Sequence, residues 1–129
     1  MNGERAQALV EFALVLPVLL VLAFGIVELS ELGVARLALQ HAASEGARTV
    51  ALTNDDQLAR SSIAAAAAPL DPRGVDVTVD PPEAQRGSDP RGTLIFVHLR
   101  YAIAAPVAFI GLPALIVRGE AARVMEWTP

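Results

Sequence analysis

The chain has 129 residues and a formal net charge of −4, and 53% of its residues are hydrophobic. All ten basic residues are arginines without a cluster, which argues against nucleic-acid binding, and the absence of cysteine excludes disulfide bonds and thiolate metal sites. About 100 residues follow an apolar N-terminal run, which is enough for one compact core.

The apolar run from Ala8 to Val27 carries one carboxylate, Glu11. About 20 helical residues span roughly 30 Å of hydrocarbon, so this run predicts a transmembrane helix. A charge inside a membrane helix costs on the order of 2.5 to 3.5 kcal/mol, so we expect Glu11 to have a cationic partner. A cut between Ala6 and Gln7 would create an α-amine one helical turn before Glu11, within reach of it in the same chain or in a neighbouring one.

Two other readings of the apolar run stay open. A secretory signal peptide has an apolar core of roughly 7 to 15 residues and a small-residue cleavage site, and the run from Phe12 to Val27 is slightly longer than that. A plain membrane anchor fits the length but leaves Glu11 unexplained. Arg5 precedes the run while Glu28 and Glu31 follow it, which predicts a cytoplasmic N-terminus and an extracytoplasmic C-terminal domain.

The helix is expected to continue outside the membrane, because no proline occurs from Glu28 to Leu52. A helix from Ala8 to Leu52 would be about 65 to 70 Å long, and Pro17 would kink it by removing one backbone hydrogen bond. Ala38, Ala42 and Gly46 recur every four residues and form a small-residue stripe that would let another backbone approach closely. A helix that merely covers a sheet explains this outer half equally well.

Capping residues and turns predict the remaining elements. The segment Thr53 to Asp56 signals the start of a second helix that runs to Ala68 and ends at Pro69. Asp-Pro-Arg-Gly occurs at 71–74 and again at 89–92, and each copy fits a type I turn that opens a strand. Strands are expected at 75–80, where valine alternates with polar residues, at 93–102, and at 116–126.

The second strand is predicted to place Ile95, Val97, Leu99 and Tyr101 on one face and Leu94, Phe96, His98 and Arg100 on the other. The connection from Ala104 to Leu115 is rich in large apolar residues, among them Val107, Phe109, Ile110 and Leu112. Such a loop either folds under the sheet edge or forms a contact patch for another subunit, and both options stay open.

The sequence offers little for catalysis or for cofactor binding. His41 and His98 are far apart, and no serine has the context of a nucleophile elbow, so we expect no enzymatic activity, no cofactor and no metal site. The acidic residues between 71 and 89 lack the dense spacing of a calcium loop and read as solvated turns.

Three stretches resemble the TadE/TadG-like minor pilins of the tight-adherence (Flp, type IVb) pilus: ALVEFALVLPVLL at 8–20, FGIVEL at 24–29 and ALQHAASEGAR at 38–48. In that family a prepilin peptidase cuts on the cytoplasmic side, with a Glu followed by an aromatic residue at a fixed distance. Glu11 and Phe12 fit this spacing, so the resemblance implies a cut after Ala6, where family members usually have glycine.

The resemblance implies a leader at 1–6, a transmembrane helix at 7–28 and an extracytoplasmic pilin-like domain at 29–129. It also implies other pilins, a prepilin peptidase, an inner-membrane assembly platform and an ATPase motor as partners. The expected fold is α+β, with a long N-terminal helix, a second short helix and a small three-stranded antiparallel sheet. The expected function is pilus assembly, and the alternative is a single-pass anchored protein that binds an envelope partner.

Overall fold

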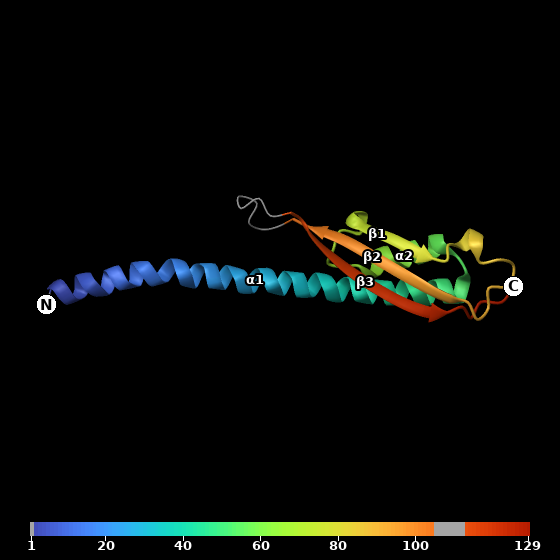
Figure 1. Ribbon diagram of the computed structural model, residues 1–129, viewed down its shortest axis with the longest axis horizontal. Helices are drawn as coiled ribbons and strands as arrows, with labels where there is room; N and C mark the ends of the chain where they lie inside the picture. The colour runs from blue at the N-terminus through green and yellow to red at the C-terminus, as the bar shows by residue number, and fades with distance from the viewer. Residues whose placement is uncertain (1, 105–112) are drawn as a thin grey trace. The chain divides into compact units, whose positions relative to one another are not determined.

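The computed structural model describes residues 2–104 and 113–129 and confirms the α+β class (Figure 1). The elements in chain order are α1 (Asn2–Thr53), α2 (Asp56–Ala66), the 3-10 helix η1 (Pro72–Gly74), β1 (Val75–Asp80), the 3-10 helix η2 (Glu83–Gln85), β2 (Leu94–Ile103) and β3 (Leu115–Val124). The apolar loop residues Val107, Phe109, Ile110 and Leu112 lie outside the described residues. The chain divides into two compact units, Met1–Gly33 and Val34–Pro129, and α1 contributes to both.

The three strands form one antiparallel sheet in the order β1-β2-β3. Ile95, Val97 and Leu99 of β2 are buried together with Val117 of β3, while the residues between them are exposed. The alternation predicted for β2 is therefore confirmed, because successive side chains of a strand point to opposite faces of the sheet.

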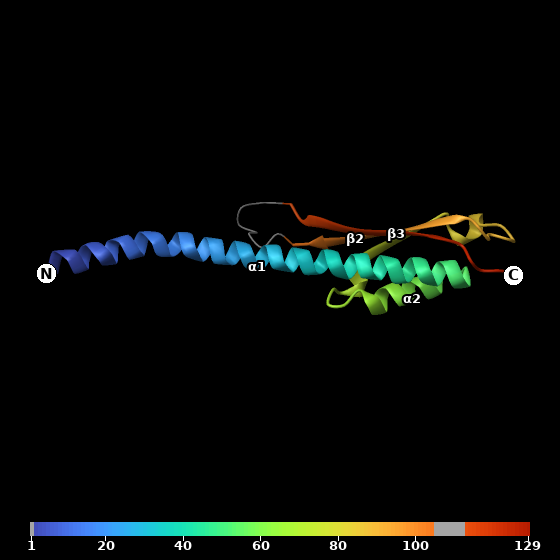
Figure 2. The same ribbon diagram turned by 90° about the horizontal axis from the view of Figure 1, so that it is seen from below.

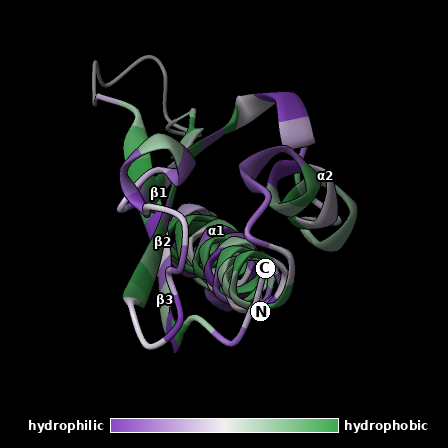
Figure 3. Cartoon of the chain, turned by 90° about the vertical axis from the view of Figure 1, so that its right-hand side faces the viewer, coloured by the Kyte–Doolittle hydropathy of each residue, from purple (hydrophilic) through white to green (hydrophobic). Residues whose placement is uncertain are grey.

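In the second unit, the end of α1 lies between the sheet and α2 (Figures 2 and 3). Small residues make this three-layer packing possible. Ala42, Ala43 and Ala47 are fully buried on α1, and Gly46 is so close to both layers that a Cβ atom there would lie 2.5 Å from Ile63 of α2 and 3.6 Å from Val97 of β2. Burial of apolar area between these layers is the main stabilising term for this unit.

The predicted cap and turns are present, with differences in detail. Asp55 caps α2 by accepting a hydrogen bond from the Leu58 backbone N–H at 2.9 Å, but α2 ends at Ala66, two residues earlier than predicted. The first Asp-Pro-Arg-Gly closes as expected, with the Gly74 N–H donating to the Asp71 carbonyl. In the second copy the turn shifts by one residue: the Thr93 N–H donates to the Pro90 carbonyl, and Gly92 takes a φ of 81°.

Replacing Gly119 by alanine should destabilise the second unit by about 1 to 3 kcal/mol, the usual cost of overpacking. β3 crosses α1 so closely here that a Cβ atom would lie 2.6 Å from the Leu39 backbone carbon, and a backbone cannot rotate away as a side chain can. Urea unfolding of the full chain in detergent micelles, followed by Trp127 fluorescence, measures this cost. Gly33→Ala is the matched control, since nothing lies within 4 Å of its added Cβ; a similar loss in both variants would contradict the argument.

Candidate functional site

The N-terminal part of α1 exposes nearly every large apolar side chain that it carries. Val21 is 74% exposed and Phe24 is 67% exposed, and none of the most apolar stretch of the helix is buried inside the protein. A soluble monomer rarely exposes so large an apolar surface. Among the described residues, α1 is the one helix long and apolar enough to cross a membrane, which makes a single-pass anchor compatible with the structure.

Glu11 lies on this apolar helix, one turn after Gln7. The Gln7 side-chain amide donates a hydrogen bond of 3.2 Å to a carboxylate oxygen of Glu11. Position 7 therefore faces the carboxylate, as the spacing of four residues requires. Phe12 is exposed beside Glu11, and Pro17 lies inside the helix, which continues on both sides of it.

The small-residue stripe of Ala38, Ala42 and Gly46 lies inside the second unit. All three residues are buried, and Gly46 lies against α2 and β2 of the same chain. The close approach that these residues permit is thus made by the chain's own elements. A different ridge of α1 is exposed, and its residues follow the alternating spacing of three and four that marks one helix face: Val34, Leu37, His41, Ser44 and Arg48.

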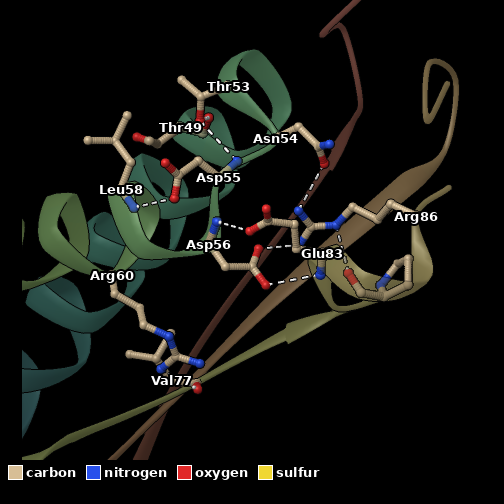
Figure 4. Close-up of polar contacts among 11 residues, drawn as sticks. Thr49, Thr53, Asn54, Asp55, Asp56, Leu58, Arg60, Val77, Glu83 and Arg86 are labelled. Carbon is tan, nitrogen blue, oxygen red and sulfur yellow. Dashed lines mark hydrogen bonds and ion pairs between the residues drawn. The ribbon is translucent and has the colours of Figure 1, made fainter. Parts of the chain in front are cut away.

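A buried arginine joins the end of α1 to the connection between β1 and β2 (Figure 4). The Arg86 guanidinium is fully buried and donates to the side-chain oxygens of Asn54 and Asp56, and its Nε donates to the Pro81 carbonyl at 2.9 Å. Each of the three guanidinium nitrogens thus has an acceptor, as buried polar groups require. We call Asn54, Asp56, Glu83 and Arg86 the arginine latch.

Asp56 and Glu83 of the arginine latch also accept hydrogen bonds from each other's backbone N–H groups. The Asp56 N–H donates to Glu83 Oε2 and the Glu83 N–H donates to Asp56 Oδ2, both at 3.1 Å. Asn54 takes a positive φ of 54°, a conformation that asparagine tolerates better than most residues after a helix end. Sequence reasoning missed this latch, because Asn54 and Asp56 carried only the signal of a helix start and their partner Arg86 lies about 30 positions away.

Side chains from the helices cap both edges of the sheet. On β3, the Gln40 side-chain amide donates to the Glu120 carbonyl at 2.7 Å and accepts from the Glu120 N–H at 3.4 Å. On β1, Arg60 donates to the Val77 carbonyl at 3.2 Å. Free edges are templates for pairing with further strands, so these caps disfavour association through the sheet edges.

No group of three or more potential metal ligands occurs among residues 2–104 and 113–129. His41 is exposed on α1, and His98 is exposed on the sheet with its Nδ1 3.5 Å from a carboxylate oxygen of Glu120.

The geometry defines a class of protein: a small α+β unit carried on a long apolar N-terminal helix with one carboxylate. Residues 6–48 match the model of the family described as TadE-like protein. The match confirms the resemblance to TadE-like proteins of the Tad pilus system and includes Ala6, Glu11 and the whole apolar run. No curated protein and no solved structure matches the chain.

Proposed function

We propose that this chain is a membrane-inserted minor pilin or pseudopilin that takes part in assembly of a tight-adherence pilus. The observation that carries this proposal is the family match over residues 6–48, because it covers the segment in which Glu11 interrupts an exposed apolar helix. A membrane anchor alone needs no carboxylate there, whereas an assembled helix can use one to set its position against a neighbour.

In this proposal a prepilin peptidase removes residues 1–6 on the cytoplasmic side, and the new α-amine of Gln7 pairs with Glu11. The hydrogen bond from the Gln7 side chain to Glu11 supports the proposal, since residue 7 lies one helical turn before the carboxylate on the same side of α1. In a low-dielectric membrane the two charges would satisfy each other, within one subunit or between staggered subunits.

The exposed ridge of α1 supplies the second surface for assembly. Leu37 is 73% exposed in the middle of this ridge, while the opposite side of the helix is covered by the sheet and α2. An apolar side chain held in water is unfavourable unless a partner covers it. We therefore assign the ridge from Val34 to Arg48, and not the buried stripe, to contact with other pilins or with the assembly platform.

Processing and incorporation test the function together. Intact-mass measurement of the protein from its native host should show loss of Met1 to Ala6, and the shortened chain should occur in filaments sheared from the cell surface or co-purify with pilins. Ala6→Gly should be processed at least as fast, if the size of the residue before the cut limits the reaction. A full-length chain in a host with an active peptidase would contradict the cut site, and absence from both filament and pilin fractions would favour the plain anchor.

A further inference from the structure

One face of the sheet has no described helix or strand packed on it. This open face consists of the even-numbered residues of the three strands, all of which are exposed: Asp76, Thr78 and Asp80 on β1, Leu94, Phe96, His98, Arg100 and Ala102 on β2, and Ile116, Arg118, Glu120, Ala122 and Val124 on β3. The opposite face supplies the core residues of β2, and the part of the chain that the structure describes leaves the open face exposed.

Two arginines stand directly opposite each other in the middle of the open face. Arg100 of β2 pairs with Arg118 of β3 in the sheet register. The Glu120 N–H and carbonyl are bonded to Gln40 and so point away from β2, and the backbone of Arg118, two residues earlier, points the same way. The Arg100–Arg118 pair is therefore of the non-hydrogen-bonded type, in which cross-strand side chains lie closest.

Neither arginine of this pair is neutralised by the part of the chain that the structure describes. The salt bridge there joins Arg86 to Asp56, and the imidazole of His98 lies 3.5 Å from Glu120. Asp76 is opposite Arg100 on β1 but forms no ion pair with it. Like charges directly opposite in a sheet are destabilising. The two arginines therefore repel each other on the exposed face.

The surroundings of the pair indicate what would neutralise it. A hollow of about 240 Å³ lies over His98, Arg100, Arg118 and Glu120, and Ile116 in the next row of the face is 52% exposed. Phe96, stacked on His98 with a ring-centroid distance of 6.1 Å, is exposed on the other side. Along the strands, Ile116 thus lies on one side of the Arg100–Arg118 pair, and Phe96 lies on the other side beyond the row of His98 and Glu120.

We propose that the open face binds a segment of a partner protein that places one carboxylate over Arg100 and Arg118 and apolar side chains over Ile116 and Phe96. The acidic residues of the same face oppose any extended polyanion, because Asp76, Asp80 and Glu120 would repel its further charges. A single carboxylate placed over the two arginines meets less of this repulsion than an extended polyanion does. The surface does not involve Glu11 or cleavage, so it can be tested separately from the assembly function.

The test uses the full chain in nanodiscs of zwitterionic lipid and a labelled peptide, acetyl-Leu-Ser-Glu-Ser-Ser-Ser-Leu-amide. In an extended conformation this peptide presents Leu, Glu and Leu on one face at the spacing of Ile116, Arg118 and Phe96. Fluorescence anisotropy should show binding with a Kd of about 1 mM or tighter, and a peptide with Gln in place of Glu should bind roughly tenfold more weakly. Empty nanodiscs correct for partitioning into lipid.

The variant R100Q/R118Q should lose the preference for the Glu peptide, whereas Arg123→Gln should keep it. Arg123 is an exposed arginine of β3 outside the open face, where it lines a separate hollow with Arg48, so it controls for the loss of a positive charge elsewhere on the same strand. The double variant should also unfold at the same or a higher temperature, since a repulsive pair is removed. Equal binding of both peptides to the parent chain, or an unchanged preference in R100Q/R118Q, would overturn the proposal. So would self-association of the parent chain that R100Q/R118Q abolishes, because a second copy would then occupy the face.

Discussion

Asp56→Ala is expected to destabilise the second unit by about 3 kcal/mol, because it leaves the Arg86 guanidinium buried without its counter-charge. The Arg86 side chain has no exposed surface, so water cannot replace the lost carboxylate without opening the structure. The substitution also removes the acceptor for the Glu83 N–H. Urea unfolding of the full chain in micelles, followed by Trp127 fluorescence, measures the change in the free energy of unfolding.

Two variants make this experiment specific to the arginine latch. Asp80→Ala removes an exposed carboxylate with no ion pair and should change stability by no more than about 0.5 kcal/mol. R86M/D56A should be less destabilised than the sum of the two single variants, because removing both charges leaves no unpaired buried ion. If Asp56→Ala and Asp80→Ala unfold alike, the latch does not hold α2 and the β1–β2 connection together.

Glu11→Gln is expected to leave membrane insertion intact and to impair incorporation into the pilus by about tenfold or more. Insertion should not suffer, because removal of a charge makes an apolar helix easier to insert. Incorporation should suffer, because the α-amine of Gln7 would lie in low-dielectric surroundings without its counter-charge. Glu11→Asp should be intermediate, since its shorter side chain reaches the amine less well.

The measurement compares cross-linking to pilins, and the number of pili, at equal membrane abundance of parent and variant. Because the chain contains no cysteine, single cysteines can be introduced as defined cross-linking positions. Leu14→Gln adds a neutral polar residue elsewhere on the same exposed helix and controls for a general loss of apolar character. A Gln variant that cross-links and supports piliation as well as the parent would leave Glu11 without an assembly role and would favour the plain anchor.

The sequence by itself determined the features that depend on neighbours along the chain. The apolar run, the period-two alternation of β1 and β2, the helix start within Thr53 to Asp56 and the first Asp-Pro-Arg-Gly turn all act within a few residues, so their patterns predict them directly. The predicted position of the second Asp-Pro-Arg-Gly turn was wrong by one residue, because the same residues can form either of two turns. The turn closes one residue later, with Gly92 in the left-handed region. The family match over residues 6–48 lies in the part with the strongest local pattern.

Only the tertiary structure decided how the outer half of α1 is used. Ala38, Ala42 and Gly46 look equally suited to a neighbouring subunit or to the chain's own sheet, because small residues permit close approach to any backbone. The sheet and α2 enclose this side of the helix, which leaves the ridge around Leu37 exposed. The arginine latch and the Arg100–Arg118 pair likewise join residues that are far apart in the chain. Burial brings the latch together and the strand register brings the two arginines together, and no local sequence pattern encodes either.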